Sequence, residues 1–156
     1  MAKFSAKAYA QKIQKKADAA LPKALENTIA PHVKRAMYLT IKENVYDSYS
    51  PRVYERRGSN DGLLDENNII SQVDGNRLRV KNIAQPNDSL FGTPLYSEPS
   101  GLLYKWIDEG LVPPVDAYPW QKKRMNLTAK MNKYLFESEG FKIKLNEAVR
   151  KEMNKK

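Results

Sequence analysis

The side chains best suited to specific chemistry in this sequence belong to two arginines that precede a polar loop. Pro51 blocks helix continuation, and residues 52–57 alternate enough to form a short strand that carries Arg56 and Arg57. A polar, glycine-containing loop over residues 58–62 follows. A guanidinium group binds a carboxylate through two parallel hydrogen bonds. The segment is therefore either a docking loop, in which Arg56 or Arg57 meets a carboxylate, or a solvated edge where a strand passes into a loop.

The residue types needed for catalysis are scarce. The chain has no cysteine and one histidine, which excludes disulfides and thiolate chemistry and removes most nucleophilic triads. His32 has no cluster of acidic or histidine residues at metal spacing, so we interpret it as a surface residue. The acidic pairs Asp65–Glu66 and Asp108–Glu109 could hold Mg²⁺ in principle, but adjacent acids are more often solvated. We expect no catalytic residue, no metal and no cofactor.

The net charge of +9 is unevenly distributed. Residues 1–50 carry +5, residues 51–120 carry −3, and residues 121–156 carry +7. Basic ends can bind nucleic acid or an acidic protein face, whereas lysine-rich solvent faces can also serve solubility alone. The longest apolar runs span only a few residues, and the N-terminus lacks the apolar stretch of a secretory signal. We therefore expect a protein without a membrane partner.

The N-terminal third has helical periodicity. An apolar stripe at intervals of three to five residues covers Phe4, Tyr9, Ile13, Ala17, Leu21, Leu25 and Ile29. Pro22 predicts a kink or a fresh helix start, and Pro31 begins a second helix that reaches Asp47. The second helix carries Val33, Met37, Ile41 and Val45 on one stripe and is the strongest core candidate in this half.

The middle of the chain has the two-residue periodicity of strands. Ile69, Ile70 and Val73 lead into Asp74-Gly75, a strong hairpin signal. The return strand places Leu78, Val80 and Asn82 on one face, and Arg77, Arg79 and Lys81 on the other. That basic face is either a nucleic-acid contact or the solvent side of an antiparallel sheet. A further strand is expected near residues 90–96.

The last third returns to helical patterns. One helix runs through residues 102–107 and ends at Gly110, another starts at Pro119 and reaches Leu135, and a third follows Gly140. The third carries an apolar stripe of Phe141, Leu145, Ala148 and Val149 beside six basic residues. Its partner could be the domain's own core or another subunit, and we expect it to dock on a neighbouring subunit or connector protein.

These patterns predict a single α+β domain, with a central antiparallel sheet containing a β-hairpin, packed by N-terminal and C-terminal helices. Residues 1–30 are expected to form an N-terminal helical arm, residues 31–139 the α+β core domain, and residues 140–156 a basic C-terminal helix.

Two motifs in order resemble the tail-completion proteins of tailed bacteriophages, also called head–tail joining or neck proteins. The first is Tyr54-x-Arg56-Arg57, then Gly62-Leu63-x-Asp65, then Asn68-Ile69. The second is Trp106-Ile107-Asp108-x-Gly110, followed by Tyr118-Pro119. The resemblance covers about residues 33 to 136. Trp120-Gln-Lys-Lys departs from it, because a second proline–aromatic pair is common at that place, and the basic tail from Gly140 has no counterpart.

The resemblance implies a non-enzymatic structural subunit of the virion neck. Such proteins form a ring, here six-fold in preference to twelve-fold, between the head connector and the tail-terminator or tail-tube proteins, and genomic DNA passes through it. The interface residues it implies are Tyr54, Arg56, Arg57, Leu63, Leu64, Asp65, Trp106, Tyr118 and Trp120. The alternatives are a nucleic-acid-binding module that uses the basic helical ends, and a metal-dependent nuclease that would need a folded carboxylate cluster.

Overall fold

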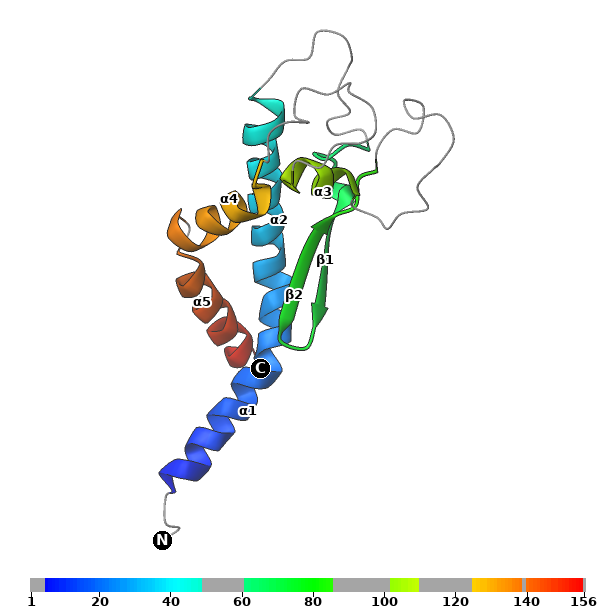
Figure 1. Cartoon of the computed structure of the whole chain (residues 1–156). Helices are drawn as coiled ribbons and strands as arrows, with labels where there is room; N and C mark the ends of the chain where they lie inside the picture. Colours follow the sequence, from blue (N-terminus) through cyan, green and yellow to red (C-terminus); the bar gives the residue numbers. More distant parts are fainter. Residues whose placement is uncertain (1–4, 49–60, 86–101, 110–124, 139, 156) are drawn as a thin grey trace, which may run out of the picture.

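The computed structural model describes residues 5–48, 61–85, 102–109, 125–138 and 140–155. Two strands lie between helices, which confirms the predicted α+β fold (Figure 1). The elements in chain order are α1 (Ala6–Ala24), a π-helical segment (Leu25–Ile29), α2 (Ala30–Ile41), a second π-helical segment (Lys42–Tyr46), a 3₁₀ turn (Glu66–Asn68), β1 (Ile69–Asp74), β2 (Arg77–Asn82), α3 (Leu102–Glu109), α4 (Leu127–Lys133), a third π-helical segment (Tyr134–Ser138) and α5 (Phe141–Asn154).

A nearly unbroken helical path runs from α1 through α2. Pro22 lies inside α1, and the backbone N–H of Leu25 donates to the carbonyls of Leu21 and Pro22, so no fresh helix starts at the proline. The path instead bends between α1 and α2 (Figure 1). Proline removes one helical hydrogen bond, and the wider π-helical turn follows directly, which accounts for the bend. Pro31 lies in the first turn of α2, but Ile29 before it already has helical dihedrals, so the helical path continues through the predicted second start.

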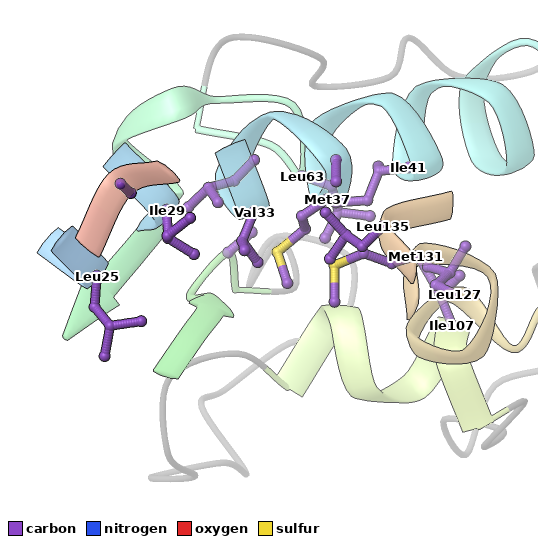
Figure 2. Packing of buried hydrophobic residues seen from close by; sticks show 14 of the residues in the cluster. Leu25, Ile29, Val33, Met37, Ile41, Leu63, Ile107, Leu127, Met131 and Leu135 are labelled. Carbon is purple, nitrogen blue, oxygen red and sulfur yellow. The ribbon is translucent and has the colours of Figure 1, made fainter. Parts of the chain in front are cut away.

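The core follows one side of this helical path. Val33, Met37 and Ile41 are buried along α2 as predicted, and Val45 is partly buried (Figure 2). Further buried positions extend the core back into the preceding turns, at Ala24, Leu25 and Ile29. α2 contacts both strands of the hairpin and also packs against α4, so it is the central element of the domain (Figure 1).

The hairpin is antiparallel, with Ile69 opposite Asn82 and Asp74 opposite Arg77. The two turn residues are therefore Gly75 and Asn76, one position later than the predicted Asp74-Gly75 pair. Gly75 has a φ of 54°, the left-handed conformation that the first position of a primed hairpin turn requires. The faces alternate as predicted, because β2 exposes its three cations and partly or fully buries the residues between them.

α4 begins later than the sequence pattern predicts. Met125 and Asn126 are not helical, and Asn126 has a φ of 51°, so a helix running from Pro119 to Leu135 is wrong at this point. The backbone N–H groups of Met125 and Asn126 donate instead to the carbonyls of Ile107 and Asp108, with N···O distances of 3.3 and 3.1 Å. These bonds fasten the chain to the end of α3. Past them, Leu127, Met131 and Leu135 are buried as expected.

α5 packs on its own chain. It contacts α1 and the π-helical segment after it, and Ala148 is buried in the core cluster. Phe141, Leu145 and Val149 are partly buried against the same cluster. α1 and the core of the same chain thus cover part of this stripe, so this part of its burial needs no neighbouring subunit, while docking of another subunit or a connector protein on α5 stays a prediction. The helix runs antiparallel to the helical path between Lys23 and His32, since Lys144 contacts His32 whereas Glu152 lies beside Asn27 and Lys23.

The first turns of α1 project away from the rest of the domain (Figure 1). Tyr9 and Ile13 are 55% and 42% exposed, although both belong to the apolar stripe of the sequence. No helix within the described ranges has both the length and the apolar character needed to cross a bilayer. The strand expected near residues 90–96 lies outside the described residues.

Candidate functional site

The candidate site is the polar loop that leads into the hairpin, together with the end of α3. Of the predicted interface residues, Leu63, Leu64 and Asp65 lie in the described part of the loop. Trp106 belongs to α3, but its side chain lies outside the description. The remaining five predicted residues also lie outside the described residues: Tyr54, Arg56, Arg57, Tyr118 and Trp120. The pairing of Arg56 or Arg57 with a carboxylate therefore stays a prediction.

Asp65 holds the loop in shape with its carboxylate. Oδ2 accepts a hydrogen bond from the backbone N–H of Asp61, and Oδ1 accepts one from the backbone N–H of Asn67, each with an N···O distance of 2.9 Å. The second bond caps the 3₁₀ turn that leads into β1. The N–H donors of Asn67 and Asp61 favour the ionised form and lower the pKa of Asp65 below its ordinary value of 3.8.

Two buried asparagines tie this loop to the base of the hairpin. Asn68 Nδ2 donates to the carbonyl of Gly62 at 3.0 Å and to Asp61 Oδ1 at 3.3 Å. Asn82 Nδ2 donates to the carbonyl of Leu63 at 2.8 Å, and its Oδ1 accepts from the backbone N–H of Ala84 at 3.0 Å. Both amide groups satisfy backbone groups that would otherwise be buried without partners. The described half of the loop is thus held at both strands of the hairpin.

Leu63 is a core residue of its own chain. It is 2% exposed and belongs to the core cluster, so its side chain offers almost no surface to a partner. Leu64 is only partly buried against the same cluster and keeps some exposed surface. The pair of leucines therefore anchors the loop on the core, whereas Asp61, Glu66 and Asn67 are exposed. Asn68 and Asn82 were missed as site residues, since an asparagine in a strand or turn looks the same in sequence whether buried or exposed.

The second motif has an equivalent structural role at the start of α4. Asp108 Oδ1 accepts from the backbone N–H of Thr128 at 3.0 Å, and Oδ2 accepts from its hydroxyl at 2.7 Å. The Tyr104 hydroxyl lies 3.3 Å from the same Thr128 oxygen. Burial raises the pKa of Tyr104 to about 12. Asp108 thereby caps α4 from a different helix, and Ile107 beside it is buried in the core.

His32 is half-buried and not a simple surface residue, because Lys144 of α5 reaches it. The Lys144 Nζ to His32 Nε2 distance is 2.5 Å, and an ammonium can only donate, so Nε2 accepts this bond. Thr28 and Glu147 line the same shallow pocket of about 220 Å³. This contact fastens the start of α5 to the start of α2.

The acidic residues considered for Mg²⁺ do not come together. Within the described ranges, no group of three or more histidine, cysteine or acidic residues is placed to hold a metal ion. Asp65 and Asp108 both use their carboxylates to accept hydrogen bonds from the backbone. The carboxylates of Asp65 and Asp108 thus hold backbone segments in place. They support the polar loops beside them.

Comparison with curated proteins finds no match, and comparison with solved structures finds none either. A family model described as YomN matches residues 9–124, which include α1 from Tyr9, the hairpin, α3 and both motifs. The chain therefore belongs to the YomN family, a family associated with bacteriophages.

Proposed function

We propose that the chain is a structural subunit of a bacteriophage neck, forming a ring that joins the head connector to the tail tube. The observation that carries the proposal is the match to a phage-associated family across residues 9–124. That range contains both motifs that resemble tail-completion proteins. The finer assignment, to the neck within the virion, rests on the order and spacing of those motifs.

The way both motifs are built supports a role in assembly. The carboxylates of Asp65 and Asp108 accept hydrogen bonds from backbone N–H groups. Asp65 fixes the backbone before β1, and Asp108 fixes it at the start of α4. Rigid supports of this kind let a loop meet a partner without a large loss of conformational entropy. A subunit that joins two preassembled structures needs such preformed surfaces more than it needs a reactive group.

The charge distribution supports contacts between copies. The central segment carries −3, whereas the two ends carry +5 and +7. In a head-to-tail ring, a basic end of one subunit can lie against the acidic centre of the next, and complementary charges of this kind mainly set orientation and partner choice.

The decisive experiment is the mass and location of the assembled protein. We expect native mass spectrometry of a purified neck fraction to give a multiple of the 17.9 kDa chain mass, six-fold in preference to twelve-fold. Electron microscopy of particles that carry a tagged chain should place the tag between head and tail. A chain that is missing from purified virions, or that lies elsewhere in them, would overturn the proposal.

A second candidate function is nucleic-acid binding. Arg77, Arg79 and Lys81 are exposed in a row on β2, on the hairpin face that points away from the core. A module of this kind binds duplex or single strands as a monomer, with an affinity that falls steeply as salt rises. Replacing all three cations with alanine should then abolish the binding seen by fluorescence anisotropy. An affinity unaffected by the triple replacement would contradict this second candidate.

A further inference from the structure

The projecting part of α1 presents an apolar stripe to solvent. Tyr9 and Ile13 are 55% and 42% exposed. Positions 9, 12, 13 and 16 share one side of an α-helix, so Lys12 and Lys16 flank the two apolar side chains. We call residues Ala6–Lys16 the arm from here on, a shorter segment than the helical arm predicted over residues 1–30.

The stripe of the arm continues into an interface within the same chain. Four- and three-residue steps lead from Ile13 through Ala17 to Ala20 and Ala24. Ala20 and Ala24 are buried, and α5 packs along this part of the molecule. One helical side is thus covered by its own chain near Ala24 and open to solvent at Ile13.

An open groove lies directly beside the covered part of the stripe. It is formed between α1 and α5 and has a volume of about 440 Å³. Its apolar lining comes from Ala17 and Leu21 of α1 and from Leu145 and Val149 of α5. The groove is open to solvent along its length, so side chains of another helix can reach its apolar lining.

The arm cannot fill the groove of its own chain. Tyr9 and Ile13 precede Ala17 and Leu21 on one continuous helix, which rises about 1.5 Å per residue and cannot fold back on itself. Every copy therefore carries an exposed apolar stripe and an open apolar groove that only another molecule can bring together. The groove also carries Asp18, whose carboxylate accepts a hydrogen bond from Gln14 at 2.8 Å, and Arg150, so its apolar side chains rather than its charge match the arm.

We propose that the arm of one copy lies in the α1–α5 groove of a second copy, with Tyr9 and Ile13 against its apolar lining. The contact joins two different surfaces of the same chain, so repeating it generates a closed ring or an open chain. This inference rests on the proposed function and deepens it, because it names the surfaces through which the copies associate.

The first test replaces matched isoleucines. Ile13→Asp places a carboxylate in the contact, whereas Ile143→Asp changes a 65% exposed isoleucine that does not line the groove. We expect Ile13→Asp to weaken self-association by at least about thirtyfold in sedimentation velocity, a loss of about 2 kcal/mol. Ile143→Asp should associate as the unchanged chain does. Circular dichroism of both variants establishes that they fold. Equal association of Ile13→Asp and the unchanged chain would overturn the inference.

The second test uses the absence of native cysteine. A variant with Ile13→Cys is mixed with a variant carrying Asn146→Cys, at an exposed residue that lines the groove. Under mild oxidation the mixture should give a disulfide-linked dimer of the two variants. A mixture of Ile13→Cys with Gln72→Cys, on the outward face of β1, should not.

The outcomes separate this inference from the proposed function. If the chain forms a ring but Ile13→Asp leaves it intact and no Ile13–Asn146 cross-link appears, the arm contact is wrong and the ring remains. If Ile13→Cys alone cross-links to itself in preference to the Asn146 variant, two arms pair with each other and the groove is not the receptor. If the chain is a monomer both in solution and in the neck fraction, both proposals fail.

Discussion

Asn82 offers the sharpest test of how the candidate loop is held. Its side chain is 2% exposed, donates to the carbonyl of Leu63 and accepts from the backbone N–H of Ala84. Alanine at this position leaves the carbonyl of Leu63 and the N–H of Ala84 without these hydrogen bonds. Each buried backbone group left without a partner costs about 1–3 kcal/mol. We therefore expect Asn82→Ala to lower the free energy of unfolding by about 2–6 kcal/mol, a large share of the roughly 5–15 kcal/mol typical of a domain.

Urea denaturation followed by circular dichroism measures this loss. The matched control is Gln72→Ala, which truncates an exposed amide on the outward face of the same hairpin and should change stability by no more than about 0.5 kcal/mol. Hydrogen exchange should also become faster in the loop before β1, because Asn82 no longer holds Leu63. A loss below about 1 kcal/mol for Asn82→Ala would show that the loop does not depend on this side chain, and the reasoning would be refuted.

Three further predictions concern two titratable side chains and the two arginines outside the described residues. The pKa of Asp65 is lowered, so its carboxylate stabilises the fold at pH values above its ordinary pKa of 3.8 and ceases to do so as pH falls through its pKa in the folded state. The difference in unfolding free energy between the unchanged chain and Asp65→Asn should therefore shrink on acidification. A difference in unfolding free energy that does not change with pH contradicts this. The pKa of Tyr104 is raised from 10.0 to about 12, so stability should fall across that interval as the unfolded state loses its proton first. Tyr104→Phe should remove that fall in urea midpoints measured over the interval, whereas Tyr9→Phe, at an exposed tyrosine, should not. Replacing both Arg56 and Arg57 with alanine should leave the midpoint of thermal unfolding unchanged and block head–tail joining. Normal yields of infectious particles from that variant would show that the loop is not a joining element.

Periodicity predicted the helices and the hairpin because each leaves a repeated mark on the sequence. The stripe of Val33, Met37 and Ile41 is buried as expected, and the alternation of β2 separates its cations from the residues that face the core. The start of α4 was misplaced because its apolar pattern extends upstream. The N-terminal end of α4 is fixed by the left-handed conformation of Asn126 and by the hydrogen bonds to the end of α3. These bonds join residues that are distant in sequence.

The site was harder to predict than the fold. The resemblance directed attention to Leu63 and Asp65, yet the sequence could not tell that one is a core residue and the other a backbone cap. Asn82 was assigned to the correct face, but its partners are the carbonyl of a residue nineteen positions earlier and a neighbouring N–H. Whether a polar residue is buried depends on the three-dimensional course of the chain, and no short-range pattern records that.

The π-helical segment between α1 and α2 also determines how mutation can reshape this protein. A π-helical turn closes its hydrogen bonds over five residues where an α-helical turn closes them over four, so it takes up one extra residue. Removing one residue from Leu25–Ile29 and restoring α-helical geometry would therefore leave the phase of α1 relative to α2 largely unchanged. A deletion within α1 between the arm and Ala24 has no such turn to absorb it, and because each residue turns an α-helix by about 100°, it would point Tyr9 and Ile13 elsewhere. Natural variation in the length of α1 is expected to accumulate at its N-terminal end, where it leaves the helical phase unchanged.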